Sequence, residues 1–314
     1  MKQLRDRIIN EVNKVVVGQN SVIDSCIIAL SVGGHVLLEG APGTAKTLVA
    51  QAFAKTLGLD FKRSQFTPDM LPSDVTGTTT LKPGASGNYD LAFRPGPIFT
   101  NIFLADEINR TPPKTQAALL EAMQEQQVSA DGVTHRLPEP FLVIATQNPI
   151  EYEGTYPLPE AQIDRFALKI NVGYPTPDLE KEMLRIKHTG ISPSTLNDIV
   201  PVGNSEEILG IKQKVDSIVV SEEVISYVSN IVRTTRDMPA LQLGASPRAA
   251  VTLLACAKAI ACLFEREYVT PDDVTFIAPS VLRHRLILSP EAELERVSTD
   301  NIISQVLSSV VVPR

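Results

Sequence analysis

The first half of the chain alternates short apolar runs with segments of helical pattern. Helices are expected at 48–57, where Gly58 follows as a stop signal, and at 113–126. Alternation of this kind is typical of a parallel sheet covered by helices. The apolar runs predict five strands, at 36–38, 61–66, 102–105, 141–145 and 168–172.

Two insertions interrupt this alternation with hairpin-like sequence. The first covers 71–97, where the turn residues 83–88 separate two candidate strands. The second covers 127–137, and in it Asp131-Gly132 divides two short alternating stretches. Asp-Gly between alternating residues is a strong hairpin signal. The sequence therefore predicts two β-hairpins inserted into the α/β pattern.

The second half of the chain has a helical pattern. The segment Tyr174-Pro175-Thr176-Pro177 forbids ordinary helix continuation and marks the end of the sheet half. We therefore expect an α/β domain over 1–175 and a helical domain over 176–314. The helices expected in the second domain lie at 206–215, 222–234, 247–264 and 271–282.

Length and composition agree with a globular protein of two domains. The chain has 314 residues, of which 43% are hydrophobic and 21% charged, enough for two separate cores. No apolar stretch is long enough to span a bilayer, so we expect no direct membrane insertion. The polar N-terminus lacks the apolar core of a secretory signal, and we therefore expect a cytoplasmic protein.

Charge and cysteine content narrow the function classes. The formal net charge is −7, aromatic residues make up 5%, and no long run of Lys or Arg occurs. This balance disfavours nucleic acid as a partner. Cys26, Cys256 and Cys262 have apolar neighbours and no metal-ligand spacing, so buried free thiols are expected. The four histidines show no ligand spacing either.

Candidate chemistry begins directly after the first expected strand, with a phosphate-binding loop. A glycine-bearing turn between a strand and a helix directs backbone N–H groups and the positive helix end toward one point, where a triphosphate can bind. Lys46 would reach the β- and γ-phosphates of ATP, and Thr47 would ligate Mg²⁺. The expected nucleotide-binding residues here are Gly40, Ala41, Pro42, Gly43, Thr44, Ala45, Lys46, Thr47 and Leu48.

One residue departs from the general pattern of this loop. The pattern has glycine before the lysine, where this chain has Ala45. Alanine strains the loop only if that position needs a positive φ. A chance turn before a helix is the alternative interpretation, but the strand, the Lys-Thr pair and the helix all favour a nucleotide site.

Two further strands end in polar residues suited to hydrolysis. At the end of the third strand, Asp106 could hold Mg²⁺ through its water shell, and Glu107 could orient and deprotonate the attacking water. At the end of the fourth, Asn148 could position that water as a polar sensor. The alternatives are a solvated acidic turn and a turn-forming Asn before Pro149.

These motifs occur together in one known family. The chain resembles the MoxR family of AAA+ ATPases from about residue 16 to residue 285. Alanine before the loop lysine is usual in that family. The resemblance rests on residues 16–19, 40–47, 106–107 and 148, on 158–166 with the preceding Gly154, and on 244–248.

The resemblance implies a P-loop AAA+ core with a parallel five-stranded sheet, followed by an all-helical lid. Such proteins form rings, usually hexamers, with ATP at each subunit interface. In the matching positions, Arg165 would be the arginine finger that reaches a neighbour's γ-phosphate. Arg248 would be the second sensor, supplied by the lid to its own subunit's nucleotide. Val17 and Gly18 would lie against the adenine.

Other interpretations of these arginines remain open at this point. Arg165 could form a salt bridge with Asp164 or Glu160, and Arg248 could be a charge in the first turn of a helix. The densest basic spot, 283–285, is expected to be solvated surface of the lid. The two hairpin insertions would match the helix-2 insert and the pre-sensor-1 hairpin, which this branch of AAA+ proteins directs toward substrate.

The sequence thus predicts a Mg²⁺-dependent ATPase whose hydrolysis drives chaperone-like remodelling of a protein partner. The resemblance implies clients such as proteins with von Willebrand factor A domains or metal cofactors. A nucleic-acid motor, the motor subunit of a metal chelatase and a nucleotide-gated scaffold are the alternatives. The acidic balance opposes the first, and the intact Lys46, Asp106, Glu107 and Arg165 oppose the last.

Overall fold

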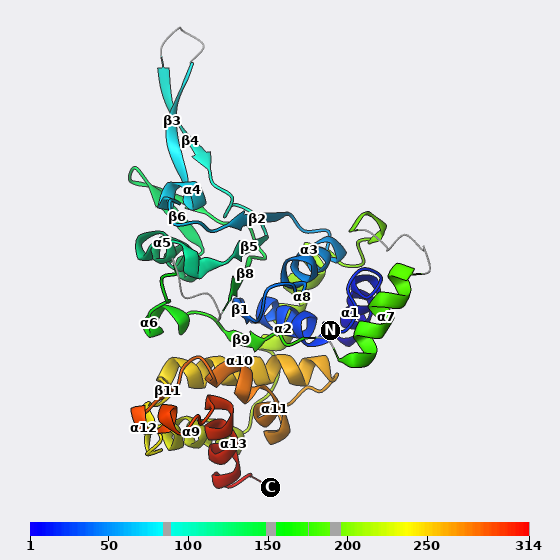
Figure 1. Ribbon diagram of the computed structural model, residues 1–314, viewed down its shortest axis with the longest axis vertical. Helices are drawn as coiled ribbons and strands as arrows, with labels where there is room; N and C mark the ends of the chain where they lie inside the picture. Colours follow the sequence, from blue (N-terminus) through cyan, green and yellow to red (C-terminus); the bar gives the residue numbers. More distant parts are fainter. Residues whose placement is uncertain (84–88, 149–154, 175, 189–195, 314) are drawn as a thin grey trace.

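Five parallel strands form the central sheet of the structure, a computed structural model that describes residues 1–83, 89–148, 155–174, 176–188 and 196–313 (Figure 1). The strand order is β2-β5-β8-β1-β9, and every neighbouring pair is parallel. The predicted five-stranded parallel sheet is therefore confirmed. Its strands are β1 (Val36–Glu39), β2 (Phe61–Gln65), β5 (Ile102–Asp106), β8 (Leu142–Gln147) and β9 (Leu168–Asn171).

Alternate residues of the central strands face two separate apolar cores. On β1, Leu38 belongs to one core and Leu37 to the other, and on β5 Leu104 and Phe103 divide in the same way. Successive side chains of a strand point to opposite faces of its sheet. Both sets are apolar when helices cover both faces. Helices α1 (Lys2–Val12), α2 (Asn20–Ser31) and α3 (Lys46–Thr56) contribute to the first core, and α5 (Pro113–Glu125) contributes to the second.

Helices α1 and α2 add to the elements expected from the sequence. In α1 the buried residues are Leu4, Ile8, Ile9 and Val12, which share one helix face, so its pattern could have revealed it. In α2 most residues are buried. A helix that is apolar on nearly all sides has only a weak amphipathic signal.

Both predicted hairpins are present. β3 (Gly77–Pro83) and β4 (Tyr89–Pro95) pair antiparallel and project from the body of the protein (Figure 1). β6 (Gln127–Ala130) and β7 (Val133–Arg136) form the second hairpin. The turn residues 84–88 lie outside the described residues, as do Pro149, Gly154 and Pro175.

The two hairpins contact each other through aromatic rings. Phe93 of β4 stacks on His135 of β7 with ring centroids 3.9 Å apart. Phe99, which follows β4, meets Phe93 edge to face. Such pairs contribute roughly 0.5–1.5 kcal/mol beyond the area they bury. The base of the longer hairpin is therefore anchored on the shorter one.

The second half of the chain is mainly helical and forms the lid. Serine side chains begin four of its described helices, and in two of them Ser221 accepts the N–H of Val224 and Ser246 accepts the N–H of Ala249. A short antiparallel pair of strands, β10 (Leu241–Leu243) and β11 (Ile287–Leu288), supplements the predicted helical lid. The main lid helices are α9 (Glu222–Arg236), α10 (Pro247–Leu263), α11 (Pro271–Leu282) and α13 (Thr299–Ser309).

One apolar core continues from the sheet into the lid. Helix α8 (Ser205–Asp216) contacts both α2 and α10, and residues of all three helices are buried in that core. The division at residues 175 and 176 therefore stays a sequence-based prediction. The remaining helices are α4 (Pro72–Thr76), α6 (Glu160–Ile163), α7 (Pro177–His188) and α12 (Pro290–Leu294), with single 3-10 turns at Ile108–Arg110 and Leu196–Asp198.

The three cysteines are buried and free, as predicted. Burial raises the pKa of the Cys26 and Cys256 thiols to about 12, so both stay protonated and unreactive at neutral pH. Within the described part of the chain, no helix combines the length and apolar character needed to cross a bilayer.

The turn from β1 into α3 places Ala45 in the left-handed region, with φ +60° and ψ +18°. This is the condition under which alanine strains the loop. A left-handed non-glycine residue costs roughly 1–2 kcal/mol, and the position immediately precedes Lys46. The loop therefore holds backbone strain where its first helical turn begins.

We expect Ala45→Gly to raise the free energy of unfolding by about 0.5–1 kcal/mol, because the gain from relieving φ exceeds the entropy that glycine adds to the unfolded chain. Ala41→Gly is the matched control, since Ala41 is in the same loop and is not among the residues with positive φ. Urea unfolding of both variants tests this. A less stable Ala45→Gly would contradict it.

His35 directly precedes β1 and contacts the neighbouring strand β8 and helix α5. It is 4% exposed. Its Nδ1 accepts the N–H of Val143 at 3.1 Å, and its Nε2 lies 3.1 Å from the carbonyl oxygen of Met123. Both contacts are satisfied by a neutral ring with its proton on Nε2. Burial lowers the pKa of His35 to about 4.

Stability should therefore fall as the pH drops from 6.5 to about 4. The unfolded chain takes up a proton on His35 near its ordinary pKa of 6.5, while the folded chain resists it, so acid favours unfolding. The loss attributable to His35 is about 3 kcal/mol. Urea unfolding at pH 7 and pH 4 should show a shallower fall in His35→Gln than in wild type. His135→Gln, at the half-buried hairpin base, should keep the wild-type slope, and equal slopes in all three proteins would refute the assignment.

Candidate nucleotide-binding site

A cavity of about 370 Å³ opens at the carboxyl edge of the sheet, over the start of α3. The ends of parallel strands meet at this edge, which is where α/β proteins bind ligands. The phosphate loop, the end of β5 and the end of β8 all line it. Its predicted residues are Pro42, Gly43, Thr44, Ala45, Lys46, Thr47, Leu48, Asp106, Glu107 and Asn148.

The loop backbone is tightly packed at its start. A Cβ on Gly40 would lie 2.3 Å from the carbonyl oxygen of Val172, so only glycine fits there. The Gly40 N–H donates to the carbonyl oxygen of Gln147 at 3.3 Å, which fixes the loop to the end of β8. Gly43 has φ +81°, a conformation that favours glycine. The loop curvature thus depends on both glycines.

Lys46 bends back across this loop. Its Nζ donates to the carbonyl oxygens of Gly40 and Ala41, each at 2.7 Å. Burial lowers the pKa of Lys46, and the nearby charges of Asp106 and Glu107 oppose that shift. The ammonium group is held over the point toward which the loop N–H groups are expected to converge.

Asp106 is a buried carboxylate with partners from three other elements. It is 6% exposed. Its Oδ2 accepts the hydroxyl of Thr47 at 3.0 Å, and its Oδ1 accepts the hydroxyl of Thr146 at 2.6 Å. Arg63 of β2 also contacts Oδ2, with Nη2 at 2.8 Å. The predicted magnesium ligands Thr47 and Asp106 are therefore adjacent.

Glu107 follows Asp106 with a left-handed backbone, at φ +59°. Its N–H donates to the hydroxyl of Thr146 at 2.8 Å. Its carboxylate accepts the side chain of Gln65 at 2.6 Å and pairs with Arg110 at 3.2 Å. Glu107 lines the cavity, and its role as the catalytic base stays a prediction.

Asn148 directly follows β8 and lines the same cavity, and it is 7% exposed. A buried amide that lines a phosphate-loop cavity is suited to orient an attacking water. Its role as a sensor stays a prediction.

Magnesium and a triphosphate fit the groups that line this cavity. The hydroxyl of Thr47 and the carboxylate of Asp106 are hard oxygen ligands, and magnesium in proteins is usually held by one or two such groups together with phosphate and water. Among the described side chains, no group of three or more His, Cys, Asp or Glu residues could hold a metal by itself.

Val17 and Gly18 do not line the described cavity. They connect to the loop through the next residue, Gln19, whose side chain donates to the Thr44 carbonyl oxygen at 3.4 Å. Gly18 has φ +87°, and a Cβ there would lie 2.5 Å from the side chain of Leu179 in α7. Their contact with adenine stays a prediction.

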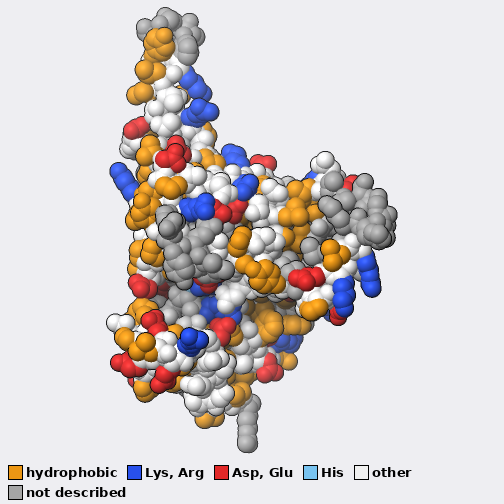
Figure 2. Space-filling view, in the orientation of Figure 1, with side chains coloured by type: hydrophobic (Ala, Val, Ile, Leu, Met, Phe, Trp, Pro, Cys, Tyr) orange, Lys and Arg blue, Asp and Glu red, His pale blue; other side chains and the backbone are white. Residues whose placement is uncertain are grey.

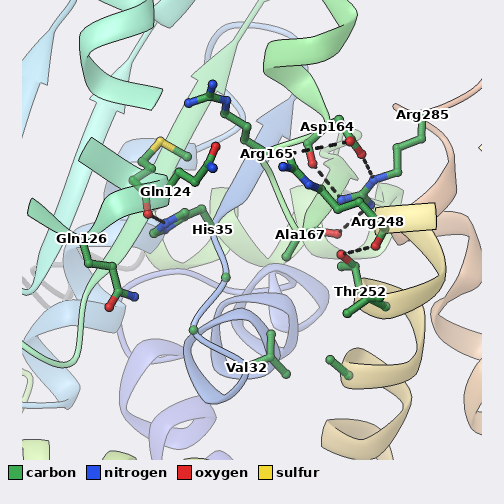
Figure 3. A pocket seen from close by; sticks show the side chains of 15 residues that line it. Val32, His35, Gln124, Gln126, Asp164, Arg165, Ala167, Arg248, Thr252 and Arg285 are labelled. Atoms are coloured by element: carbon green, nitrogen blue, oxygen red, sulfur yellow. Dashed lines mark hydrogen bonds and ion pairs between the residues drawn. The ribbon is translucent and has the colours of Figure 1, made fainter. Parts of the chain in front are cut away.

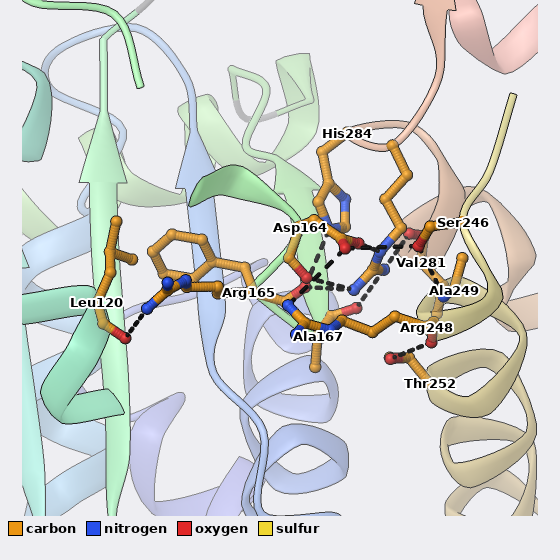
Figure 4. Close-up of polar contacts among 12 residues, drawn as sticks. Leu120, Asp164, Arg165, Ala167, Ser246, Arg248, Ala249, Thr252, Val281 and His284 are labelled. Atoms are coloured by element: carbon orange, nitrogen blue, oxygen red, sulfur yellow. Dashed lines mark hydrogen bonds and ion pairs between the residues drawn. The ribbon is translucent and has the colours of Figure 1, made fainter. Parts of the chain in front are cut away.

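The two predicted arginines lie in a second cavity, of about 330 Å³, between the sheet and the lid (Figure 3). None of its lining residues lines the first cavity. Arg165 donates to the carbonyl oxygen of Leu120 at 2.9 Å, and Arg248 lies 3.9 Å from Asp164 (Figure 4). Arg165 is thus bonded to a backbone oxygen, whereas Arg248 stands in the first turn of α10. Arg248 does not line the phosphate-loop cavity, and its role as second sensor stays a prediction.

Asp164 is instead paired with Arg285 of the lid. The Arg285 Nε donates to Asp164 Oδ1 at 2.6 Å, and its Nη2 donates to the carbonyl oxygens of Asp164 and Phe166 at 3.1 and 2.7 Å. Further donations reach the carbonyls of Ala167 and Val281. The expectation that residues 283–285 are solvated surface is wrong: Arg285 is 7% exposed, because backbone carbonyls of the lid and the sheet need its donors.

Sequence reasoning did not identify Arg63, Gln65, Thr146 and Arg285. The first two alternate on β2, a partly exposed edge strand, where polar side chains are common and therefore give only a weak signal. Their importance follows from the pairing of β2 with β5, where Gln65 lies opposite Asp106. That pairing depends on strand order, which the local pattern does not contain.

Comparisons with known proteins agree with this geometry. Residues 35–168 match the model of the ATPase family associated with various cellular activities (AAA), and residues 233–306 match that of the AAA lid domain. The chain is 43% identical to "Chaperone MoxR1" of Mycobacterium tuberculosis, over 98% of this chain and 82% of that protein. It is 32% identical to "Protein MoxR" of Methylorubrum extorquens, over 96% and 93%.

A solved structure is also similar along nearly the whole chain. It is that of a candidate ATPase from Cytophaga hutchinsonii, with a TM-score of 0.89 and 42% identity, covering 99% of this chain and 96% of that one. The match includes both the sheet domain and the lid. The chain therefore belongs to the MoxR family of AAA+ ATPases.

Proposed function

We propose that this protein hydrolyses ATP with Mg²⁺ at the interfaces of a ring of identical subunits, and that hydrolysis drives the remodelling of a protein client in the cytoplasm. The observation that carries this proposal is the convergence of Lys46, Thr47, Asp106 and Glu107 on one cavity. Phosphoryl transfer needs positioning and charge neutralisation rather than covalent chemistry from the protein, and these groups provide both.

The roles follow from the contacts of each group. Loop N–H groups and Lys46 would bind the phosphates, and Thr47 and Asp106 would hold Mg²⁺. Mg²⁺, when bound, supplies charge that neutralises the β- and γ-phosphate oxygens. Glu107 would take the proton of the attacking water, which Asn148 would help to orient. For this Glu107 must exchange its contacts with Gln65 and Arg110 for the water.

The ring is supported by the separation of the two cavities. Arg165 is bonded to α5 and lies in a cavity that the phosphate loop does not line, so as a finger it would act on a neighbour's nucleotide. Arg248 shares that cavity and is close to Asp164. The sequence-based assignment of Arg248 to its own subunit's nucleotide needs a lid movement, whereas a role beside Arg165 needs none.

A protein client is favoured by the surface of the β3–β4 hairpin. Leu81 pairs with Leu91, and Tyr89 lies on the same face of the ribbon two residues before Leu91; Leu81, Tyr89 and Leu91 are 63%, 70% and 75% exposed. Figure 2 shows hydrophobic side chains gathered on one side of this hairpin and basic ones on the other. A nucleic-acid motor would be expected to present a basic, aromatic groove instead.

The name of the mycobacterial relative, a chaperone, agrees with a client that is a protein. We carry over from the family resemblance the expectation that clients include von Willebrand factor A domain proteins or proteins with metal cofactors. Strong stimulation of ATPase activity by DNA would favour the helicase-like alternative, and stimulation by a chelatase partner would favour the chelatase motor.

We expect Lys46→Ala to lose ATP binding, because the loop loses the only ammonium that the described structure places over it. Glu107→Gln should bind ATP normally and hydrolyse it about a hundredfold more slowly or worse, since the base is lost while the loop is intact. Calorimetry and phosphate release measure the two steps. Exposed residues of α5 supply the controls, Lys114→Ala and Glu121→Gln, which should match wild type. Equal turnover in Glu107→Gln and wild type would remove the catalytic assignment.

We expect Arg165→Ala to bind ATP yet hydrolyse it roughly a thousandfold more slowly. When this variant is mixed with Lys46→Ala, some interfaces combine an intact loop with an intact finger, so activity should partly return. The exposed Arg233→Ala should behave as wild type. No recovery in rings shown to be mixed would refute a finger acting between subunits.

A second mixture of the same design decides the role of Arg248. If Arg248 serves its own subunit's nucleotide, Arg248→Ala mixed with Lys46→Ala contains no complete site and stays inactive. If Arg248 acts beside Arg165 on the neighbour, the mixture recovers activity. Sequential affinity capture through two different tags, one on each variant, establishes that the rings contain both variants.

A further inference from the structure

Arg63 of β2 has a position that the proposed mechanism does not use. Its side chain lines the phosphate-loop cavity and contacts the buried carboxylate of Asp106. Both Nε, at 3.0 Å, and Nη2, at 2.8 Å, contact one oxygen, Oδ2. That oxygen also accepts the hydroxyl of Thr47.

The geometry of β2 fixes this contact. Arg63 pairs with Leu104 of β5, and Gln65 pairs with Asp106, so alternate side chains of β2 lean over the carboxyl end of β5. Arg63 reaches Asp106, while Gln65 donates to Glu107. Arg63 also donates to Gln65 at 2.6 Å, which orients its guanidinium.

Asp106 needs a cation in the absence of a metal. Asp106 is only 6% exposed, and a buried charge is costly unless it is paired. The other nearby cation, Lys46, is directed to the carbonyl oxygens of Gly40 and Ala41. Arg63 therefore supplies the direct countercharge, and it does so on the oxygen that, with Thr47, would face magnesium. Two cations cannot both occupy that oxygen without strong repulsion.

We propose that Arg63 is the resident counter-ion of Asp106, which keeps divalent metal off the nucleotide-free site and gives way only when metal arrives together with the triphosphate. The inference rests on the proposed ATPase function. The side chain of Arg63 is 42% exposed, so it can leave the carboxylate for solvent at little cost. Arg63 thereby couples metal entry to nucleotide entry and stabilises the empty site.

The test measures the affinity of the nucleotide-free protein for Mn²⁺. Electron paramagnetic resonance detects the Mn²⁺ that remains free in solution. Arg63→Met keeps the length of the side chain and removes its charge, and it should bind Mn²⁺ about tenfold more tightly than wild type, or better. Lys62→Met is the matched control. Lys62 is the next residue on β2, is exposed and donates to the Phe99 carbonyl oxygen, so its loss changes net charge equally without reaching Asp106.

Two further variants locate the effect. Arg63→Lys retains a cation and should stay close to wild type in Mn²⁺ affinity. Adding Asp106→Asn to Arg63→Met should abolish the gained Mn²⁺ binding, because the ligand itself is removed. Equal Mn²⁺ affinity in wild type and Arg63→Met, or a gain of the same size in Lys62→Met, would overturn the proposal.

Thermal unfolding keeps the test decisive if Arg63→Met is unstable. The loss of the counter-ion should lower its melting temperature, and Mn²⁺ without nucleotide should restore it, while wild type should respond little to the ion. A destabilised variant that Mn²⁺ does not restore would count against the proposal. Calorimetry with ATP and Mg²⁺ on wild type separates the two hypotheses: no binding there refutes the ATPase proposal, whereas normal binding with unchanged Mn²⁺ affinity in Arg63→Met refutes only the counter-ion.

Discussion

The buried negative charge of Asp106 needs partners, and the residues that provide them connect the elements of the candidate site. Thr47 comes from the helix after the phosphate loop, Thr146 from β8 and Arg63 from β2, and all three contact this side chain. A charge with so little exposure is stable only when its partners are held in place, so the requirement fixes the relative positions of three neighbouring elements. The loop, the predicted base and the predicted metal ligands are consequently held in position by contacts within the chain itself.

The buried positive charge of Arg285 likewise connects the elements around the second cavity. The guanidinium of Arg285 bonds the end of α11 to the backbone of residues 164–167, which includes Arg165. Asp164 also lies close to Arg248 in α10 and accepts the hydroxyl of Ser246. The lid is therefore bonded directly to the segment that carries the predicted finger. A change in lid orientation would move that segment with it, because these contacts are buried and satisfied on both sides.

Particular residues show which parts of the fold and the site could be predicted from the sequence. The strands, the loop and the acidic pair were predictable because each depends on local pattern, and Ala45 was correctly identified as the position where strain would arise if φ were positive. Arg63 and Arg285 were not predictable in this way. One acquires its partner through strand order and the other through the packing of the lid on the sheet, and neither is encoded within a short window.

The same limit explains the placement of Arg248, and it bears on assembly. Within one chain the lysine loop and the arginines occupy cavities with no lining residue in common. To bring Arg165 to its own loop, the chain would have to break the contact with the Leu120 carbonyl and pull on a segment that Arg285 bonds to the lid. A second subunit that supplies the phosphate needs no such rearrangement. The proposed ring would therefore complete the site while the contacts of Arg165 with Leu120 and of Arg285 with the sheet stay intact.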